Sequence, residues 1–194
     1  MRGRHLTRLL TVAFAIALPL AACGKHVDPD QALQEGLAQQ QAGNMEAAAE
    51  QYQLVLDVRP DDKYANYNLG VIEQTDGRVE LAEGYYRAAL DTDANFVPAL
   101  FNLAILRTRA GATQEAIDLY LQVIGIQPDY AAAHFNLGIL YRDAGKSDLA
   151  DKYINQALAL DPTLADRLDT QPVDPGSPAA SGDGSASPVA STSS

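Results

Sequence analysis

Small and apolar residues repeat along the chain with a period of 34 residues. The clearest columns are one of glycine and one of alanine, made of Gly43, Gly77, Gly111 and Gly145, and of Ala48, Ala82, Ala116 and Ala150. Within one period, apolar residues recur three and four positions apart in two separate stretches, which is the spacing of an amphipathic helix. Examples are Leu100, Leu103 and Ala104 in a first stretch, and Ala116, Leu119, Tyr120 and Val123 in a second. The pattern predicts four consecutive units of two helices each, at residues 29–62, 63–96, 97–130 and 131–164.

Turn and breaker residues separate the predicted helices. Gly111 suits the left-handed position that ends the first helix of its unit, and Pro128 cannot continue the second helix. Small residues such as Gly70 and Ala82 are expected where the two helices of a unit cross closely. The larger Tyr86 is expected to fill the space between neighbouring units. These features predict an all-α protein in which helix pairs stack side by side into an α-solenoid.

The repeated pattern resembles the tetratricopeptide repeat, most clearly at Asn68-Leu69-Gly70 and at Asn136-Leu137-Gly138. The resemblance implies an α-solenoid of four helix-turn-helix repeats within residues 29–168. The first unit has Glu35 where the family has leucine, which suits an N-terminal cap.

In the tetratricopeptide family, the first helix of each unit lines a concave groove that binds peptides. The matching positions here hold aromatic, asparagine and aliphatic residues: Tyr67, Phe101 and Phe135; Asn68, Asn102 and Asn136; and Val71, Ile105 and Ile139. An asparagine carboxamide offers a donor and an acceptor to the backbone of an extended peptide, while the apolar positions bury the peptide's side chains. The alternative is that these asparagines only satisfy the backbone of their own repeat.

Residues 1–22 have the pattern of an export signal. Three arginines precede an apolar run over residues 9–20, which is too short to cross the roughly 30 Å hydrocarbon core of a bilayer as a helix. The run ends in Leu20-Ala21-Ala22-Cys23, which resembles the lipobox of bacterial lipoproteins. The resemblance implies cleavage before Cys23, followed by a diacylglycerol and an N-acyl chain on this residue. The alternative is an ordinary signal peptide followed by a chance cysteine.

Lipid on Cys23 would hold the protein at a membrane without a spanning helix, since two or more acyl chains give a stable anchor. In relatives with two membranes, an aspartate after the lipidated cysteine retains a lipoprotein in the inner membrane. Gly24 stands at that position, so export to the periplasmic face of the outer membrane is expected. Residues 23–28 form the linker, and Gly24 to Asp28 reach at most about 17 Å.

The end of the chain departs from the repeat pattern. Residues 163–168, with Leu164 and Leu168 one turn apart, are expected to form a partial capping helix. A short cap would leave part of the last unit's apolar face exposed, which would support self-association. Residues 169–194 consist almost wholly of Pro, Gly, Ser, Ala and Asp, so burial cannot offset their conformational entropy and a disordered tail is predicted.

Composition and charge exclude several classes of function. The chain carries 25 acidic and 14 basic residues, and its net charge of −11 disfavours nucleic acid as a partner. The three histidines, His5, His26 and His134, form no cluster, so no metal site and no histidine general base are expected. Gly145-Lys146-Ser147 is similar to the end of a phosphate-binding loop, but Leu140 replaces its first glycine. No catalytic role is expected, and no cofactor other than the covalent lipid.

These expectations together describe a lipid-anchored adaptor or scaffold that binds a protein or an extended peptide in the bacterial cell envelope. Tetratricopeptide lipoproteins of this kind act, for example, in pilus assembly and in envelope biogenesis. One alternative is a structural or self-associating envelope protein whose groove is unused. Another is a non-catalytic accessory subunit of an envelope enzyme.

Overall fold

The computed structural model describes residues 27–168. The predicted signal peptide, Cys23 and the predicted tail at 169–194 lie outside the described residues. Within 27–168 the chain forms eight α-helices and one short 3₁₀ helix, with no strand. Their bounds are α1 (Pro29–Gln41), α2 (Met45–Val58), α3 (Lys63–Thr75), α4 (Val79–Thr92), α5 (Val97–Arg109), α6 (Thr113–Ile126), α7 (Ala131–Asp143), α8 (Ser147–Leu160) and η1 (Pro162–Arg167). The all-α prediction is confirmed.

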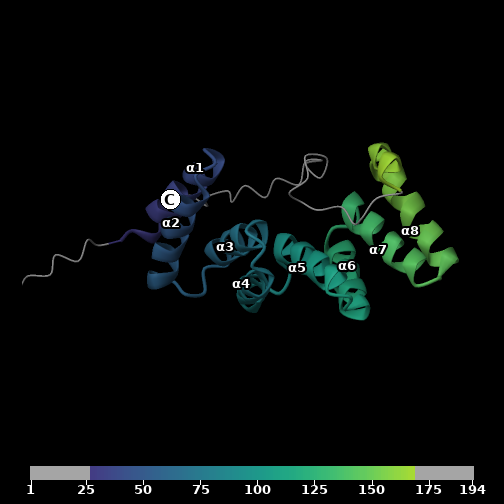
Figure 1. Ribbon diagram of the computed structural model, residues 1–194, viewed down its shortest axis with the longest axis horizontal. Helices are drawn as coiled ribbons and strands as arrows, with labels where there is room; N and C mark the ends of the chain where they lie inside the picture. The colour runs from purple at the N-terminus through teal and green to yellow at the C-terminus, as the bar shows by residue number, and fades with distance from the viewer. Residues whose placement is uncertain (1–26, 169–194) are drawn as a thin grey trace, which may run out of the picture.

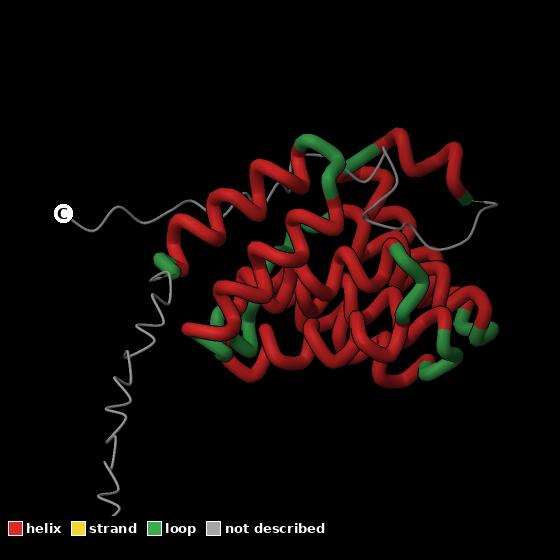
Figure 2. Tube along the Cα trace, turned by 60° about the vertical axis from the view of Figure 1, so that its left-hand side comes forward, coloured by secondary structure: helices red, strands yellow, loops and turns green. Residues whose placement is uncertain are grey.

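The helices form four hairpins that follow one another along the long axis of the molecule. Each helix packs against the next in sequence, most extensively within the pairs α1–α2, α3–α4, α5–α6 and α7–α8. Figure 1 shows that the row of hairpins is curved, with its two ends raised above its middle. Figure 2 shows that only short loops join the helices. The predicted stack of helix pairs is therefore the observed fold.

Local signals place the helix ends where the repeat predicts them. The carboxylate of Asp62 accepts hydrogen bonds from the backbone N–H groups of Tyr64 and Ala65, which caps the start of α3. The turn glycines, such as Gly77 and Gly111, have φ angles of 76° and 72°. This left-handed conformation strains a residue with a side chain, so glycine is the residue that ends the first helix of each hairpin.

Tyr86, which was expected to fill the space between neighbouring units, lies inside its own hairpin. Tyr86 is fully buried, and a Cβ atom added to Gly70 of the same unit would lie 2.6 Å from its ring. The ring therefore lies between the two helices of its own hairpin, and it needs the glycine opposite. In the last unit Ile154 replaces the tyrosine and the backbones come closer, because a Cβ atom at Gly138 would lie 3.0 Å from the Ile154 backbone nitrogen.

The expected capping helix is the 3₁₀ helix η1. The carboxylate of Asp161 caps it by accepting from the Thr163 backbone N–H, and Leu164 is buried against Phe135 of α7. Arg142 Nη1 donates a hydrogen bond of 2.6 Å to the Leu168 carbonyl oxygen. The cap covers the last hairpin only in part.

The close approach at Gly138 gives a test of the packing. We expect Gly138→Ala to lower the free energy of unfolding by about 1–3 kcal/mol, because the added methyl group meets backbone atoms that have no room to move. The matched control is Gly84→Ala in α4, where an added Cβ meets nothing within 4 Å. That substitution should stabilise the protein by about 0.4–1 kcal/mol. Urea denaturation followed by circular dichroism measures both, and equal effects would contradict the packing described.

Candidate binding surface

The structure places most of the predicted groove residues inside the fold. We use "inner surface" for the side of α1, α3, α5 and α7 on which these positions lie. Seven of the nine residues are buried: Asn68, Phe101, Asn102, Ile105, Phe135, Asn136 and Ile139. Tyr67 and Val71 are half-buried. An incoming peptide therefore meets other side chains before it meets most of the predicted set.

The asparagines of the third and fourth repeats are bonded to tyrosine hydroxyls of the preceding repeat. Asn102 Nδ2 donates to the Tyr86 hydroxyl oxygen over 3.3 Å, and Asn136 Nδ2 donates to the Tyr120 hydroxyl oxygen over 3.2 Å. The Tyr86 hydroxyl in turn donates to Gln74 Oε1 over 2.8 Å. These bonds join neighbouring repeats. Neither interpretation of the asparagines, as peptide ligands or as partners of their own backbone, predicted this role. Peptide binding by the asparagines stays a prediction.

The aromatic residue of the predicted groove packs against the last residue of its own unit. The ring centroids of Tyr67 and Phe96 are 5.4 Å apart in an edge-on arrangement. Those of Phe101 and Tyr130 are 4.8 Å apart. In the fourth repeat Leu164 packs on Phe135 in the same way. The sequence analysis missed Phe96 and Tyr130, although both hold an aromatic ring at the same place in their repeats.

Phe96 contacts Tyr64 and Tyr67, and separately Phe101 contacts Tyr130. Tyr67 lies close enough to Tyr130 to raise its pKa. We define the two groups together, Tyr64, Tyr67, Phe96, Phe101 and Tyr130, as the aromatic cluster. Three of its tyrosine rings are half-buried and so reach the surface. Lys63 Nζ lies 5.2 Å from the ring centroids of both Tyr64 and Phe96, a distance at which a cation is attracted to a ring face. The cluster is thus an apolar surface with the ion pair of Lys63 and Asp93 at its edge.

Hydrogen bonding and burial shift the pKa values of polar groups in the cluster and beside it. Lys63 Nζ donates to Asp93 Oδ2 over 2.6 Å, and this bond raises the pKa of the lysine and lowers the pKa of the carboxyl. Burial raises the pKa of Tyr130 to about 12, with a smaller contribution from Tyr67, and burial also raises the pKa of Tyr67. Both hydroxyls therefore remain protonated at neutral pH. The same burial withdraws both hydroxyls from solvent, so the exposed parts of the rings are what a peptide would contact first.

The histidine at the start of the fourth repeat is buried and bonds to the preceding repeat. His134 is 4% exposed, and its Nε2 lies 2.8 Å from the Pro128 carbonyl oxygen. Asn66 has the same relation to the preceding repeat, since its Nδ2 donates to the Pro60 carbonyl oxygen over 3.1 Å. Each side chain satisfies a carbonyl at the proline that ends the previous unit. Both therefore serve the connection between repeats.

The described residues contain neither a cluster of metal-ligating side chains nor a membrane-spanning helix. Nowhere in residues 27–168 do three or more His, Cys, Asp or Glu side chains come together as metal ligands would. The helices in the same part of the chain are too short or too polar to traverse a bilayer.

The asparagine bonds can be tested apart from any partner. We expect Asn102→Ala to lower the free energy of unfolding by about 1–3 kcal/mol, because it removes a buried donor shared with Tyr86 and Tyr67. Asn155→Ala is the control, since Asn155 is exposed on α8. Urea denaturation monitored by circular dichroism compares the two variants. A loss no larger than that of the control would show that the bond between repeats has little energetic weight.

Comparisons with known proteins agree with this geometry. Family models described as tetratricopeptide repeat match residues 33–95 and 131–164, and one described as TPR repeat matches residues 106–145. No curated protein sequence matches the chain.

Solved structures show the same fold. A crystal structure of MamA is similar with a TM-score of 0.65 at 22% identity, over 72% of this chain and 81% of that one. A structure of PilF from Pseudomonas aeruginosa has a TM-score of 0.61 at 27% identity, and the match covers 69% of this chain and 61% of that one. The repeat period, the hairpin stack and the matched families agree, and the chain belongs to the tetratricopeptide repeat family.

Proposed function

We propose that this protein is a membrane-anchored scaffold that binds a protein or an extended peptide through the inner surface. The aromatic cluster is the observation that carries the proposal. Tyr64, Tyr67 and Tyr130 are half-buried, and each presents part of its surface on the side of the hairpins that binds partners in this family. Tyrosine gives large contact areas at low entropic cost, so it is enriched among the residues that dominate binding energies.

The proposed binding surface is the rim of the predicted groove and not its floor. Asn102 and Phe101 lie beneath Tyr67 and Tyr130 and keep those rings in place. A partner segment would therefore contact the tyrosines first, with its apolar side chains against the exposed parts of their rings. This mode of binding needs no rearrangement of the buried core.

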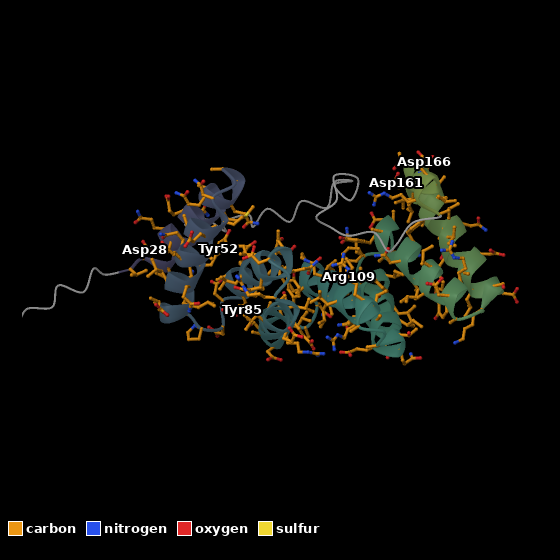
Figure 3. All side chains as sticks on the ribbon, viewed as in Figure 1. Asp28, Tyr52, Tyr85, Arg109, Asp161 and Asp166 are labelled. Carbon is orange, nitrogen blue, oxygen red and sulfur yellow. The ribbon has the colours of Figure 1, made fainter. Side chains whose placement is uncertain are left out.

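The proposed anchor is the diacylglycerol and N-acyl chain on Cys23. The linker from Gly24 to Asp28 would keep the first repeat within about 17 Å of the bilayer surface. Asp28 lies at one end of the row of hairpins, and Asp161 and Asp166 lie at the other (Figure 3). The solenoid would thus be tethered by its first repeat. We propose the periplasmic face of the outer membrane as the site, in a process such as pilus assembly or envelope biogenesis.

Partner binding through the cluster is tested by capture in the native envelope. We expect the double variant Tyr64→Ser with Tyr130→Ser to lose at least tenfold in crosslinking to its specific partner, a loss typical of central contact residues. Tyr85→Ser, on α4, is the matched control and should crosslink as the wild type does. Circular dichroism confirms that both variants are folded. Equal capture by the double variant and the control would contradict the proposal.

The anchor is tested by fractionation. We expect Cys23→Ser to release the protein from the total membrane fraction, because no acyl chain is then attached. Gly24→Asp is the control, since it keeps the cysteine and should leave the protein on membranes while shifting it to the inner one. A Cys23→Ser protein that stays on membranes through a high-salt wash would rule out the lipid anchor.

A further inference from the structure

The described part of the chain is packed from Val27 onward. Val27 packs against the core of the first hairpin, and the Asp28 carboxylate caps α1 by accepting from the backbone N–H of Asp30. Three residues separate Val27 from Cys23, and the four steps between them cover at most about 14 Å when extended. With the proposed lipid on Cys23, the start of α1 therefore lies within this distance of the bilayer headgroups.

The start of α1 belongs to one long edge of the stack, which we call the tethered edge. It consists of the starts of the first helices, the ends of the second helices and the loops between hairpins, at residues 27–30, 57–64, 91–97, 126–131 and 160–163. Arg59 joins the first two hairpins there. Its Nη1 lies 2.9 Å from Asp30 Oδ1 at the start of α1, and its Nη2 lies 3.2 Å from Asp62 Oδ2 at the start of α3.

The next loops continue the tethered edge in the same direction. Thr92 Oγ1, at the end of α4, donates to the Asp61 carbonyl oxygen over 2.8 Å. Gln122 Nε2, in α6, donates to the Ala94 carbonyl oxygen over 2.8 Å. A series of contacts therefore connects the start of α1 with the loops on either side of α3 and α4 and with α6.

The aromatic cluster lies where the inner surface meets the tethered edge. Tyr64 is the second residue of α3, and Phe96 and Tyr130 stand directly before α5 and α7. The starts of α1 and α3 are two helix-packing steps apart, which is about 20 Å at most. The edge that the lipid would hold near the bilayer is thus the edge that carries the proposed binding residues.

The charge of the tethered edge disfavours direct contact with lipid. Its two basic residues within the described chain, Arg59 and Lys63, are both in ion pairs. Acidic side chains are exposed along it, at Asp57, Asp61, Asp91 and Asp129. Anionic phospholipids repel such a surface, so the edge would face the bilayer without pressing into it. A polypeptide that rises from the bilayer would meet the cluster first.

We propose that the tethered edge faces the bilayer and that the aromatic cluster binds the membrane-proximal segment of a protein anchored in the same membrane. The proposal rests on the proposed function, because it uses both the lipid on Cys23 and the cluster. Apolar side chains of the segment pack on the exposed parts of the rings, and basic side chains lie near the aspartates of the edge. Anchoring of both proteins in one membrane raises their effective concentration, as a linker between them would.

Fluorescence quenching by lipid tests the orientation. The chain contains no tryptophan, so an introduced tryptophan reports on its own position. Val58→Trp and Met45→Trp change exposed residues at the two ends of α2, about 20 Å apart along a helix of 14 residues. The mature lipidated variants are placed in phosphatidylethanolamine and phosphatidylglycerol vesicles that contain phosphatidylcholine with a nitroxide on its headgroup. We expect Val58→Trp to be quenched severalfold more strongly than Met45→Trp.

A second pair of variants tests the edge beside the cluster. Ile126→Trp and Thr113→Trp change exposed residues at the end and the start of α6, and the first should be quenched more strongly. Equal quenching within either pair, in protein that floats with the vesicles, would overturn the proposed orientation and leave the lipid anchor standing. Protein that does not float would contradict the anchor and this inference with it.

Photo-crosslinking in the native envelope tests the class of partner. The photoreactive residue p-benzoylphenylalanine replaces Asn95, an exposed residue next to Phe96, and mass spectrometry maps the crosslinked segment. We expect this segment to lie within about a dozen residues of a lipidated cysteine or a membrane-spanning segment, since an extended chain of that length covers about 40 Å. The same photoreactive residue at Gln114, exposed at the start of α6 on the opposite edge, is the matched control.

Several results would overturn the proposed class of partner. They are crosslinks from Asn95 no stronger than those from Gln114, and crosslinks to lipid, to a second copy of this chain or to a segment far from any membrane anchor. Loss of capture in the Tyr64 and Tyr130 variant would survive the last of these results, so the binding function is tested separately.

Discussion

The structure depends on buried tyrosines whose hydroxyls accept a hydrogen bond from an asparagine of the next hairpin, as Tyr86 does from Asn102 and Tyr120 from Asn136. The ring of Tyr86 also lies against Gly70 of its own hairpin, whereas the hairpin of Tyr120 has Ala104 at the place of this glycine. The ring sets the spacing within a unit, and the hydroxyl ties that unit to its neighbour. Since the tyrosine and the asparagine each have their own place in the 34-residue period, this bond joins the second hairpin to the third and the third to the fourth.

This bond also bears on the proposed mode of binding. Because Asn102 and Asn136 are used between repeats, the floor of the inner surface is part of the core. The residues above it, Tyr67 and Tyr130, are held by that floor and still reach solvent. In the proposed mode, a change in the buried floor would act on folding, whereas a change in the residues above it would act on recognition.

The helices could be predicted from sequence because their signals are local. Gly77 and Gly111 mark turns through their own backbone preference, and the spacing of apolar residues shows which face of a helix is buried. The cover of Tyr130 over Phe101 could not be predicted in this way. Tyr130 stands just before α7, where the direction of its side chain depends on how two hairpins dock. The partner of Asn102 was missed for the same reason, since a column of asparagines does not show which hydroxyl faces it.

The two ends of the stack bear on the alternative of a self-associating protein. The first repeat has exposed Gln31 and Glu35 where the later repeats bury alanine and leucine, so α1 presents a polar outer face. At the other end, Leu149 and Leu160 of α8 are exposed, but so are Leu81 and Ile126 at the same places of earlier hairpins, so this exposure is not special to the end of the stack. Stacking copies end to end would place the last hairpin against a face with Glu35, which would lose its hydration without gaining an ion partner. Growth by head-to-tail stacking is therefore disfavoured, and the geometry agrees better with a scaffold that binds a different partner along its length.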